Sequence, residues 1–286
     1  MLNLIVALAE EARPVIHHYR LKRLHHLHAF PVYGSDDIRL IVSGIGNLAA
    51  ATATGYLAGI GDVTKSAAWL NIGIAGSNSL AVGEIVLAHK VMDVTRQQHF
   101  YPTLCFEVAC KTATIDTVAV PQTDYVAGVV YDMEAAGFFS AAMRFSTTEM
   151  IHCLKIISDN NAGDVDNISA ASVVSLVEQR MDAISDVVGK LLEMINELTA
   201  DNRGEQEMDF IRSRFYLTVS QQTQLNTLMQ NWFALTDVSP LALLNIDTLK
   251  TSKALLHALQ VKLNELPVKY LAPQPCFLRS MLKSHY

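Results

Sequence analysis

The sequence is poor in charged residues and in cysteine, and no apolar run approaches the roughly 20 residues needed to span a bilayer. Only 17% of the residues are charged and 50% are hydrophobic, so the chain can bury a sizeable core and is not expected to be disordered. Its net charge of −6 argues against broad electrostatic binding of nucleic acid or of an anionic membrane.

Signals for secretion are also missing. The four cysteines show no C-x-x-C spacing and indicate no disulfide framework. The apolar run Leu2–Leu8 is short for a signal segment, has no basic region before it, and is followed at once by Glu10 and Glu11. We therefore expect a globular cytoplasmic protein.

Histidine is concentrated in one stretch near the N-terminus. Five histidines lie there among basic residues: His17, His18, His25, His26 and His28. Because no cysteine or acidic cluster accompanies them, we interpret the stretch as a solvated basic face and predict no metal site.

Over the first two hundred residues, short apolar runs alternate with helical patterns. Leu2–Leu8 and Ala68–Ile72 are typical of strands covered on both faces. Ala135–Ala142 predicts a buried helix, and apolar residues at steps of four and three predict one long helix over Ser169–Leu198. We predict an α/β domain over residues 1–200, a three-layer α/β/α sandwich with a central mixed sheet.

The remainder of the chain predicts helices alone. Residues 201–209 are polar and break the periodicity, so we place a linker there. In residues 210–286, Thr218 with Gln221 forms a capping-box pattern, and Asp247 can cap a later helix. We expect a small C-terminal all-α domain, in which no motif for chemistry is found.

Two glycine-containing loops follow strand-like runs. In Ser43–Gly46, a strand, a loop and a helix follow one another, an arrangement that can present backbone N–H groups to an anion or a sugar. In Asn71–Gly76, Gly73 and Gly76 permit close approach of a ligand to the backbone. The glycines of the first loop do not match a dinucleotide fingerprint, and a tight turn without a ligand is the alternative.

Acidic residues stand where ligands commonly bind in α/β proteins. Asp132 and Glu134 precede the apolar helix, at whose N-terminus carboxylates are favoured. Asp159 follows an apolar strand, at the sheet edge where such folds bind ligands. Together they suggest a site, although a purely structural role as caps is the alternative.

Two motifs carry a resemblance to a known family. The run DMEAAG at 132–137, followed by SDNNAGD at 158–164, resembles the nucleoside phosphorylase superfamily. That group includes purine nucleoside phosphorylases, methylthioadenosine/S-adenosylhomocysteine nucleosidase and futalosine hydrolase. The resemblance, which covers roughly residues 1–198, implies an enzyme that cleaves the N-glycosidic bond of a small nucleoside. It also implies a homo-oligomer without a metal or redox cofactor.

The resemblance implies roles for individual residues. Glu134 would hold the ribose hydroxyls and Met133 would pack against the sugar. Asp159, oriented by Ser158, would give a proton to the departing base or share one with it. The glycine loops would lie near the ribose and the nucleophile, and they contribute Ser43, Gly44, Gly73, Ile74, Ala75 and Gly76.

The nucleophile's binding residues match neither known pattern. Nucleosidases activate water with a glutamate in the loop after the first strand. An ungapped comparison puts Ala12 there, just after Glu10 and Glu11, and a shift of one residue would let Glu11 serve as the base.

Hexameric phosphorylases instead bind phosphate with an early arginine, for which Arg13 is the candidate. They add an arginine and a serine where this chain has Asn71 and Ile74. We favour phosphorolysis with phosphate as co-substrate. Hydrolysis and a catalytically inactive nucleoside sensor or scaffold are the alternatives.

Overall fold

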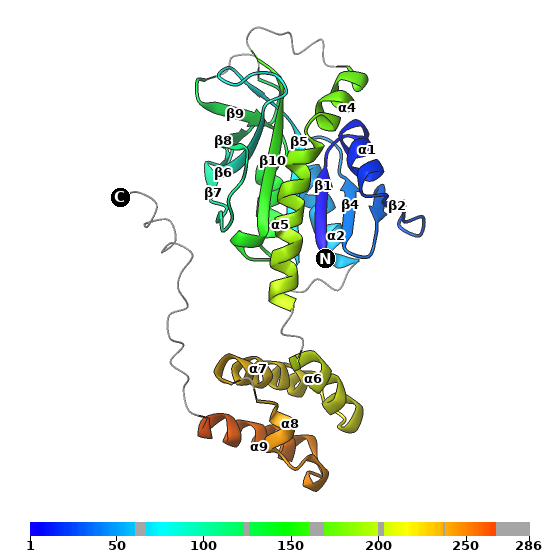
Figure 1. Ribbon diagram of the computed structural model, residues 1–286, viewed down its shortest axis with the longest axis vertical. Coiled ribbons are helices and arrows are strands. Elements are labelled where there is room, and N and C mark those ends of the chain that lie inside the picture. Colours follow the sequence, from blue (N-terminus) through cyan, green and yellow to red (C-terminus); the bar gives the residue numbers. More distant parts are fainter. Residues whose placement is uncertain (61–66, 123–125, 161–168, 200–202, 237, 267–286) are drawn as a thin grey trace, which may run out of the picture. The chain divides into compact units, whose positions relative to one another are not determined.

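The chain folds as two compact units. The computed structural model describes residues 1–60, 67–122, 126–160, 169–199, 203–236 and 238–266. The units are Met1–Thr199 and Ala200–Tyr286, and each is described by itself (Figure 1). Among the described residues, no helix combines the length and the apolar character that crossing a membrane requires.

The first unit is built on a mixed sheet, in which the described residues form ten strands. They are β1 (Leu2–Val6), β2 (Lys22–Arg23), β3 (Val32–Gly34), β4 (Ile38–Val42), β5 (Ala68–Ser77), β6 (Ile85–Asp93), β7 (Gln98–Phe100), β8 (Lys111–Thr117), β9 (Val129–Asp132) and β10 (Ile151–Asp159). Their order is β10-β6-β8-β9-β5-β1-β4-β3-β2, with β7 paired to β6.

An additional pairing between β10 and β5 closes part of this sheet into a ring of β5, β9, β8, β6 and β10, whereas β1, β4, β3 and β2 extend from β5 as an open sheet. Strands β1, β5 and β10 run parallel to one another. Their carboxyl ends therefore lie at one edge, where open α/β sheets bind ligands.

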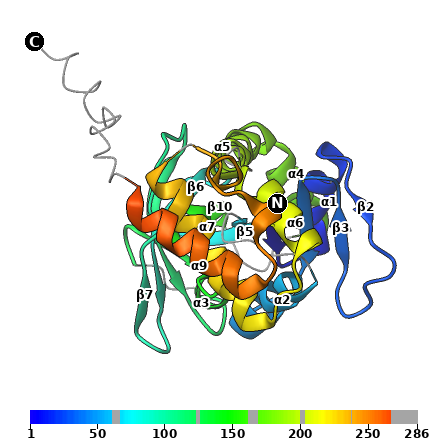
Figure 2. The same ribbon diagram turned by 90° about the horizontal axis from the view of Figure 1, so that it is seen from below.

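Helices cover both faces of the sheet (Figure 2). On one face lie α1 (Ala9–His18), α4 (Ala170–Glu178) and α5 (Met181–Thr199), and on the other α2 (Asn47–Gly59) and α3 (Ala135–Ala142). Each face has its own buried core. The predicted three-layer sandwich with a mixed sheet is confirmed.

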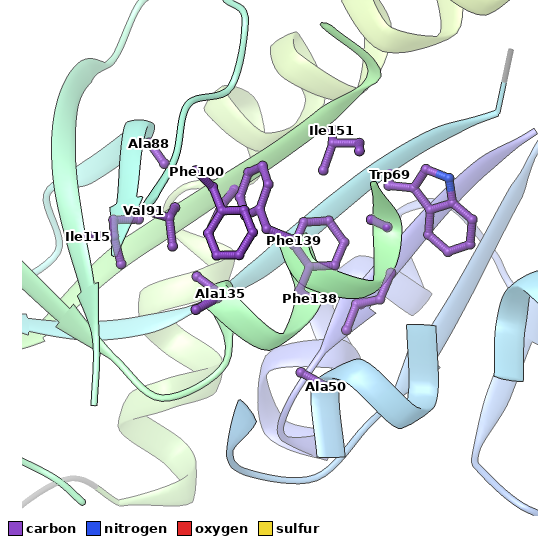
Figure 3. Close-up of a cluster of buried hydrophobic side chains, with 14 of the residues drawn as sticks. Ala50, Trp69, Ala88, Val91, Phe100, Ile115, Ala135, Phe138, Phe139 and Ile151 are labelled. Carbon is purple, nitrogen blue, oxygen red and sulfur yellow. The ribbon is translucent and has the colours of Figure 1, made fainter. Parts of the chain in front are cut away.

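Aromatic side chains fill the core beneath α3 (Figure 3). Phe138 and Phe139 are almost fully buried, and Phe139 stacks on Phe100 with ring centroids 5.8 Å apart. Trp69 and Ile151 lie in the same cluster. Because α3 is apolar on nearly every side, it is embedded as predicted, and the residues at its N-terminus are held firmly at the sheet edge.

The predicted long helix over Ser169–Leu198 is in fact two helices, α4 and α5, which break at Gln179 and Arg180. Val177, Met181 and Ile184 stay buried on both sides of the break. The apolar stripe thus continues through the turn, which is why periodicity alone did not reveal it.

The second unit contains α6 (Arg203–Arg214), α7 (Val219–Leu235), α8 (Pro240–Leu243) and α9 (Ser252–Glu265) around its own core, with Trp232 at 0% exposure. The capping box at Thr218 is confirmed, since Thr218 and Gln221 bond each other's backbone N–H. Asp247 does not cap α9. Thr251 does so, while Asp247 pairs with Arg214 at 2.7 Å.

The predicted linker at 201–209 needs correction, because α6 begins at Arg203. Most of its residue types favour helices, and the single glycine, Gly204, falls near the helix start. The polar character of residues 201–209 suggests a loop, whereas the structure has a helix from Arg203 onward. Residues 201–202 of that linker and 267–286 of the predicted helical domain lie outside the described residues.

The crossing of α2 and α3 allows a sharp test. A Cβ on Gly137 would lie 2.0 Å from the carbonyl oxygen of Asn47. We predict that Gly137→Ala lowers the free energy of unfolding by about 1–3 kcal/mol through overpacking. Urea denaturation followed by Trp69 fluorescence, with Trp232 replaced by Phe, measures it.

The matched control is Gly189→Ala in α5, where the added Cβ meets no heavy atom within 4 Å apart from its chain neighbours and the backbone of its own helix. This variant should be stabilised by about 0.5–1 kcal/mol. Equal effects of the two substitutions would contradict the close approach of α2 and α3.

Candidate functional site

A cavity of about 180 Å³ lies at the edge where β1, β5 and β10 end. Its walls come from the loop after β1, the first glycine loop, the end of β5, the residues around β9 and the end of β10. The lining residues are Ala7, Leu8, Glu11, Ile45, Ile74, Ala75, Gly76, Val118, Pro121, Gln122, Tyr131, Asp132, Met133, Glu134, Ser158 and Asp159.

Glu11 is buried on α1, with its carboxylate between two backbone donors. Oε2 accepts a hydrogen bond from Leu8 N and Oε1 accepts one from Ile74 N, each at 2.8 Å. Burial raises the pKa of Glu11 to about 7, although both hydrogen bonds and the charge of Lys155 oppose the rise. The carboxyl group is therefore poised to exchange a proton near neutral pH.

Glu134 immediately precedes α3 and reaches the first glycine loop. Its Oε1 accepts a hydrogen bond of 2.8 Å from Gly46 N. Gly46 has a φ of 102°, which favours glycine there. Burial raises the pKa of Glu134, the charge of Lys155 opposes this, and Asp132 adds to it.

Asp159 lies at the end of β10, beyond an irregularity in the pairing with β5. The register shifts between Ile157 and Asp159, so Ser158 is an extra residue in the strand. Ser158 Oγ lies 2.5 Å from Asp159 Oδ1, and the Asp159 side chain is buried against the cavity. Such bulges commonly aim a side chain into a site.

Lys155 is the functional candidate that sequence reasoning missed. Its side chain is 1% exposed, and Nζ lies 2.8 Å from Asp132 Oδ2 and 3.8 Å from Glu134 Oε2. Burial alone would lower the pKa of Lys155, but Asp132 and Glu134 outweigh it and raise the pKa. The available signal was a single lysine inside an apolar strand, because a buried charge requires a partner.

Gly73 makes room for this arrangement. A Cβ at this position would lie 3.1 Å from Glu11 Oε1 and 3.2 Å from Lys155 Nζ. A side chain at this position would push one or both groups away, so glycine lets them lie close to β5. The predicted close approach at Gly73 thus involves the chain's own charged side chains.

The structure brings most of the predicted site residues together. Glu11, Glu134, Met133, Ser158, Asp159, Ile74, Ala75 and Gly76 all line the cavity. The last four residues of the second motif, 161–164, lie outside the described residues.

Other predicted residues lie elsewhere. Ser43 Oγ contacts the carbonyl oxygens of Val6 and Gly44, and Gly44 N donates to Ala7, so these two residues stabilise the loop behind the cavity. Glu10 and Arg13 do not line the cavity, and Arg13 is exposed.

The residues at the positions of the two superfamily patterns lie partly in the core. Ala12 packs in the core, so the one-residue shift that puts Glu11 at the cavity is what the structure has. Asn71, at an expected phosphate position, is buried, and it bonds the backbone of Ile5 and the thiol of Cys153.

Comparison with solved structures defines the fold. A 5′-methylthioadenosine nucleosidase of Arabidopsis thaliana is 15% identical, covering 68% of this chain and 95% of that one, with a TM-score of 0.51. The first unit has this fold. The 5′-methylthioadenosine/S-adenosylhomocysteine nucleosidase of S. pneumoniae was solved with a transition-state inhibitor. It is 19% identical, covering 69% of this chain and 99% of that one, with a TM-score of 0.51.

A third nucleosidase, from Colwellia psychrerythraea and in complex with adenine, is 21% identical over 68% and 95% of the chains, with a TM-score of 0.50. No protein-family model and no curated protein matches the sequence. The solved structures thus confirm the fold that the two motifs implied.

The buried ammonium group gives the second prediction. Lys155→Met leaves Asp132 and Glu134 without a cation, so the free energy of unfolding should fall by about 3–5 kcal/mol at pH 8. The loss should be smaller at pH 5, because Glu134, whose pKa burial already raises, can then take up a proton. Chemical denaturation at both pH values measures it.

Lys111→Met is the control. Lys111 pairs with Glu84 across the surface and its side chain is 68% exposed, so its loss should cost less than about 1 kcal/mol at either pH. If Lys155→Met lowered the free energy of unfolding no more than this control does, a stabilising pairing of Lys155 with Asp132 and Glu134 would be refuted.

Proposed function

We propose that this protein is a nucleosidase, an enzyme that hydrolyses the N-glycosidic bond of a nucleoside. One observation carries the proposal: Glu11, Glu134 and Asp159, which are far apart in the sequence, line a single cavity. Cleavage of this bond needs a group at the departing base, a group at the ribose and a base for the nucleophile. The three carboxyl groups can fill these three roles.

In the proposed reaction, the bond between C1′ and the base nitrogen breaks as positive charge develops on the sugar. Asp159 supplies a proton to the departing base. The water oxygen bonds to C1′ while Glu11 takes one water proton. Glu134 binds the ribose hydroxyls, and its negative charge stabilises the cationic sugar.

The electrostatics of the cavity support water as the nucleophile. None of its described lining residues is lysine or arginine, and Asp132 already neutralises the nearby Lys155. Arg13 is exposed on α1, and Asn71 is engaged within the core. A phosphate dianion would therefore meet carboxylates with little compensation, and we propose hydrolysis in place of the phosphorolysis favoured from the sequence.

The lining also supports a substrate class. The neighbours' names refer to 5′-methylthioadenosine, and one neighbour holds adenine. Leu8, Ile45, Val118 and Met133 make much of the cavity wall apolar. We propose an adenine nucleoside with an uncharged 5′ substituent. The homo-oligomer and the cytoplasmic location remain predictions.

The proposal is tested by measuring base release from methylthioadenosine, adenosine, inosine, guanosine and futalosine, each with and without phosphate. We expect release from at least one adenine nucleoside, at the same rate in both conditions. Glu11→Gln, Glu134→Gln and Asp159→Asn should each lower kcat by at least about 10²-fold.

Glu10→Gln is the matched control, because Glu10 neighbours Glu11 but lies off the cavity, and its activity should equal that of the wild type. Release that requires phosphate would overturn hydrolysis in favour of phosphorolysis. Binding of a nucleoside without release would overturn the enzyme and support the sensor.

The pH dependence follows from Glu11. The reaction needs its ionised form, and burial raises its pKa to about 7. We expect kcat/KM to fall about tenfold per pH unit below about pH 7. Glu11→Gln should remove this acid limb from the residual activity. A flat profile between pH 5 and pH 8 in the wild type would exclude Glu11 as the base.

A further inference from the structure

Asp132 lines the cavity, yet both of its oxygens are occupied by the protein itself. Oδ1 accepts a hydrogen bond of 2.7 Å from Thr117 Oγ1. Oδ2 accepts hydrogen bonds from Glu134 N at 3.2 Å and Ala135 N at 2.8 Å. The ammonium group of Lys155 also lies 2.8 Å from Oδ2. Asp132 thus caps α3 and holds a buried cation at once.

Lys155 links Asp132 to the carboxyl groups assigned to the reaction. It lies on β10, whereas Asp132 ends β9, Glu134 precedes α3 and Glu11 belongs to α1. The other titratable groups nearby are the buried thiol of Cys153, which also lies on β10, and Asp159 at the cavity.

The balance of charge around Lys155 depends on Asp132. Lys155 Nζ lies 2.8 Å from Asp132 Oδ2 and 3.8 Å from Glu134 Oε2, so Asp132 is the closer of the two acids by 1.0 Å. Without the Asp132 charge, the field of the ammonium group would act mainly on Glu134 and Glu11. Both carboxyl groups would then ionise more readily, because a nearby positive charge favours their charged form.

We propose that Asp132 is a positioning residue for the reaction, which holds Lys155 in place and through it sets the pH at which the cavity carboxyl groups ionise. This inference rests on the proposed nucleosidase function for its kinetic consequence alone. The coupling between Asp132, Lys155 and Glu11 is a property of the free protein.

Asp132→Asn removes the charge and preserves the shape. Its amide oxygen can accept from the donors that face Oδ2, while its NH2 group faces Thr117 Oγ1. Asp93→Asn is a matched control, since Asp93 is also buried and caps two backbone N–H groups, those of Thr95 and Arg96, away from the cavity.

The first measurement is the titration of the Glu11 carboxyl group by NMR in protein labelled with ¹³C at the glutamate carboxyl carbon, with Glu11→Gln identifying its signal. In Asp132→Asn the midpoint should move down by about one pH unit or more, because Lys155 is less neutralised. In Asp93→Asn it should not move. This readout requires no turnover.

The second measurement is the pH profile of kcat/KM for the nucleoside that the wild type cleaves. In Asp132→Asn the acid limb should shift down with the NMR midpoint, and kcat/KM at pH 8 should fall at least about tenfold because Lys155 turns towards Glu134. Asp132→Glu, which keeps the charge, should restore the wild-type acid limb.

An unchanged Glu11 midpoint in folded Asp132→Asn, as in Asp93→Asn, would overturn the inference and leave Asp132 with a capping role only. An upward shift would also overturn it. If the wild type cleaves no nucleoside while the midpoint still moves down, the proposed function fails and the coupling stands.

Discussion

The first unit depends on one buried charge. Lys155 sits in the middle of β10 with its ammonium group out of reach of water, and desolvation of such a group costs several kcal/mol unless partners compensate. Asp132 and Glu134 compensate for it, and they can do so only because β9 and β10 both pair with β5, which brings the end of β9 and the start of α3 within reach of Lys155. The β9–α3 connection and the sheet edge are therefore fixed by electrostatics as well as by apolar packing.

Glycine makes this geometry possible at three contacts. Gly73 leaves space beside β5 for Glu11 and Lys155, and Gly46 adopts a positive φ that turns its N–H towards Glu134. Gly137 lets α2 and α3 touch backbone to backbone. Each glycine serves a contact between elements that are distant in sequence, so the site is assembled by close approach and not by one local motif.

Features encoded locally were predictable from the sequence. The apolar run of α3 and the acids before it signalled a buried helix with charges at its N-terminus, and the end of β10 placed Asp159 at the sheet edge. Lys155 was missed because its partners lie on other strands, and sequence periodicity carries no information about pairing across the sheet. Glu10 and Glu11 are adjacent residues of α1, so only the packing of α1 against the sheet decides which of them faces the cavity.

Glu11 shows that capping and the proposed catalytic role place opposite demands on one side chain. As a cap, it accepts hydrogen bonds from Leu8 and Ile74, which favour its ionised form, but its burial outweighs them. Because the folded-state pKa is raised from 4.5 to about 7, the group favours folding below pH 4.5 and loses that contribution as the pH rises from 4.5 through about 7. The loss is about 3 kcal/mol on the scale of the shift. The form of Glu11 that would accept a proton from water in the proposed reaction is thus the form that the fold stabilises least, a trade-off between stability and activity that the proposed role predicts.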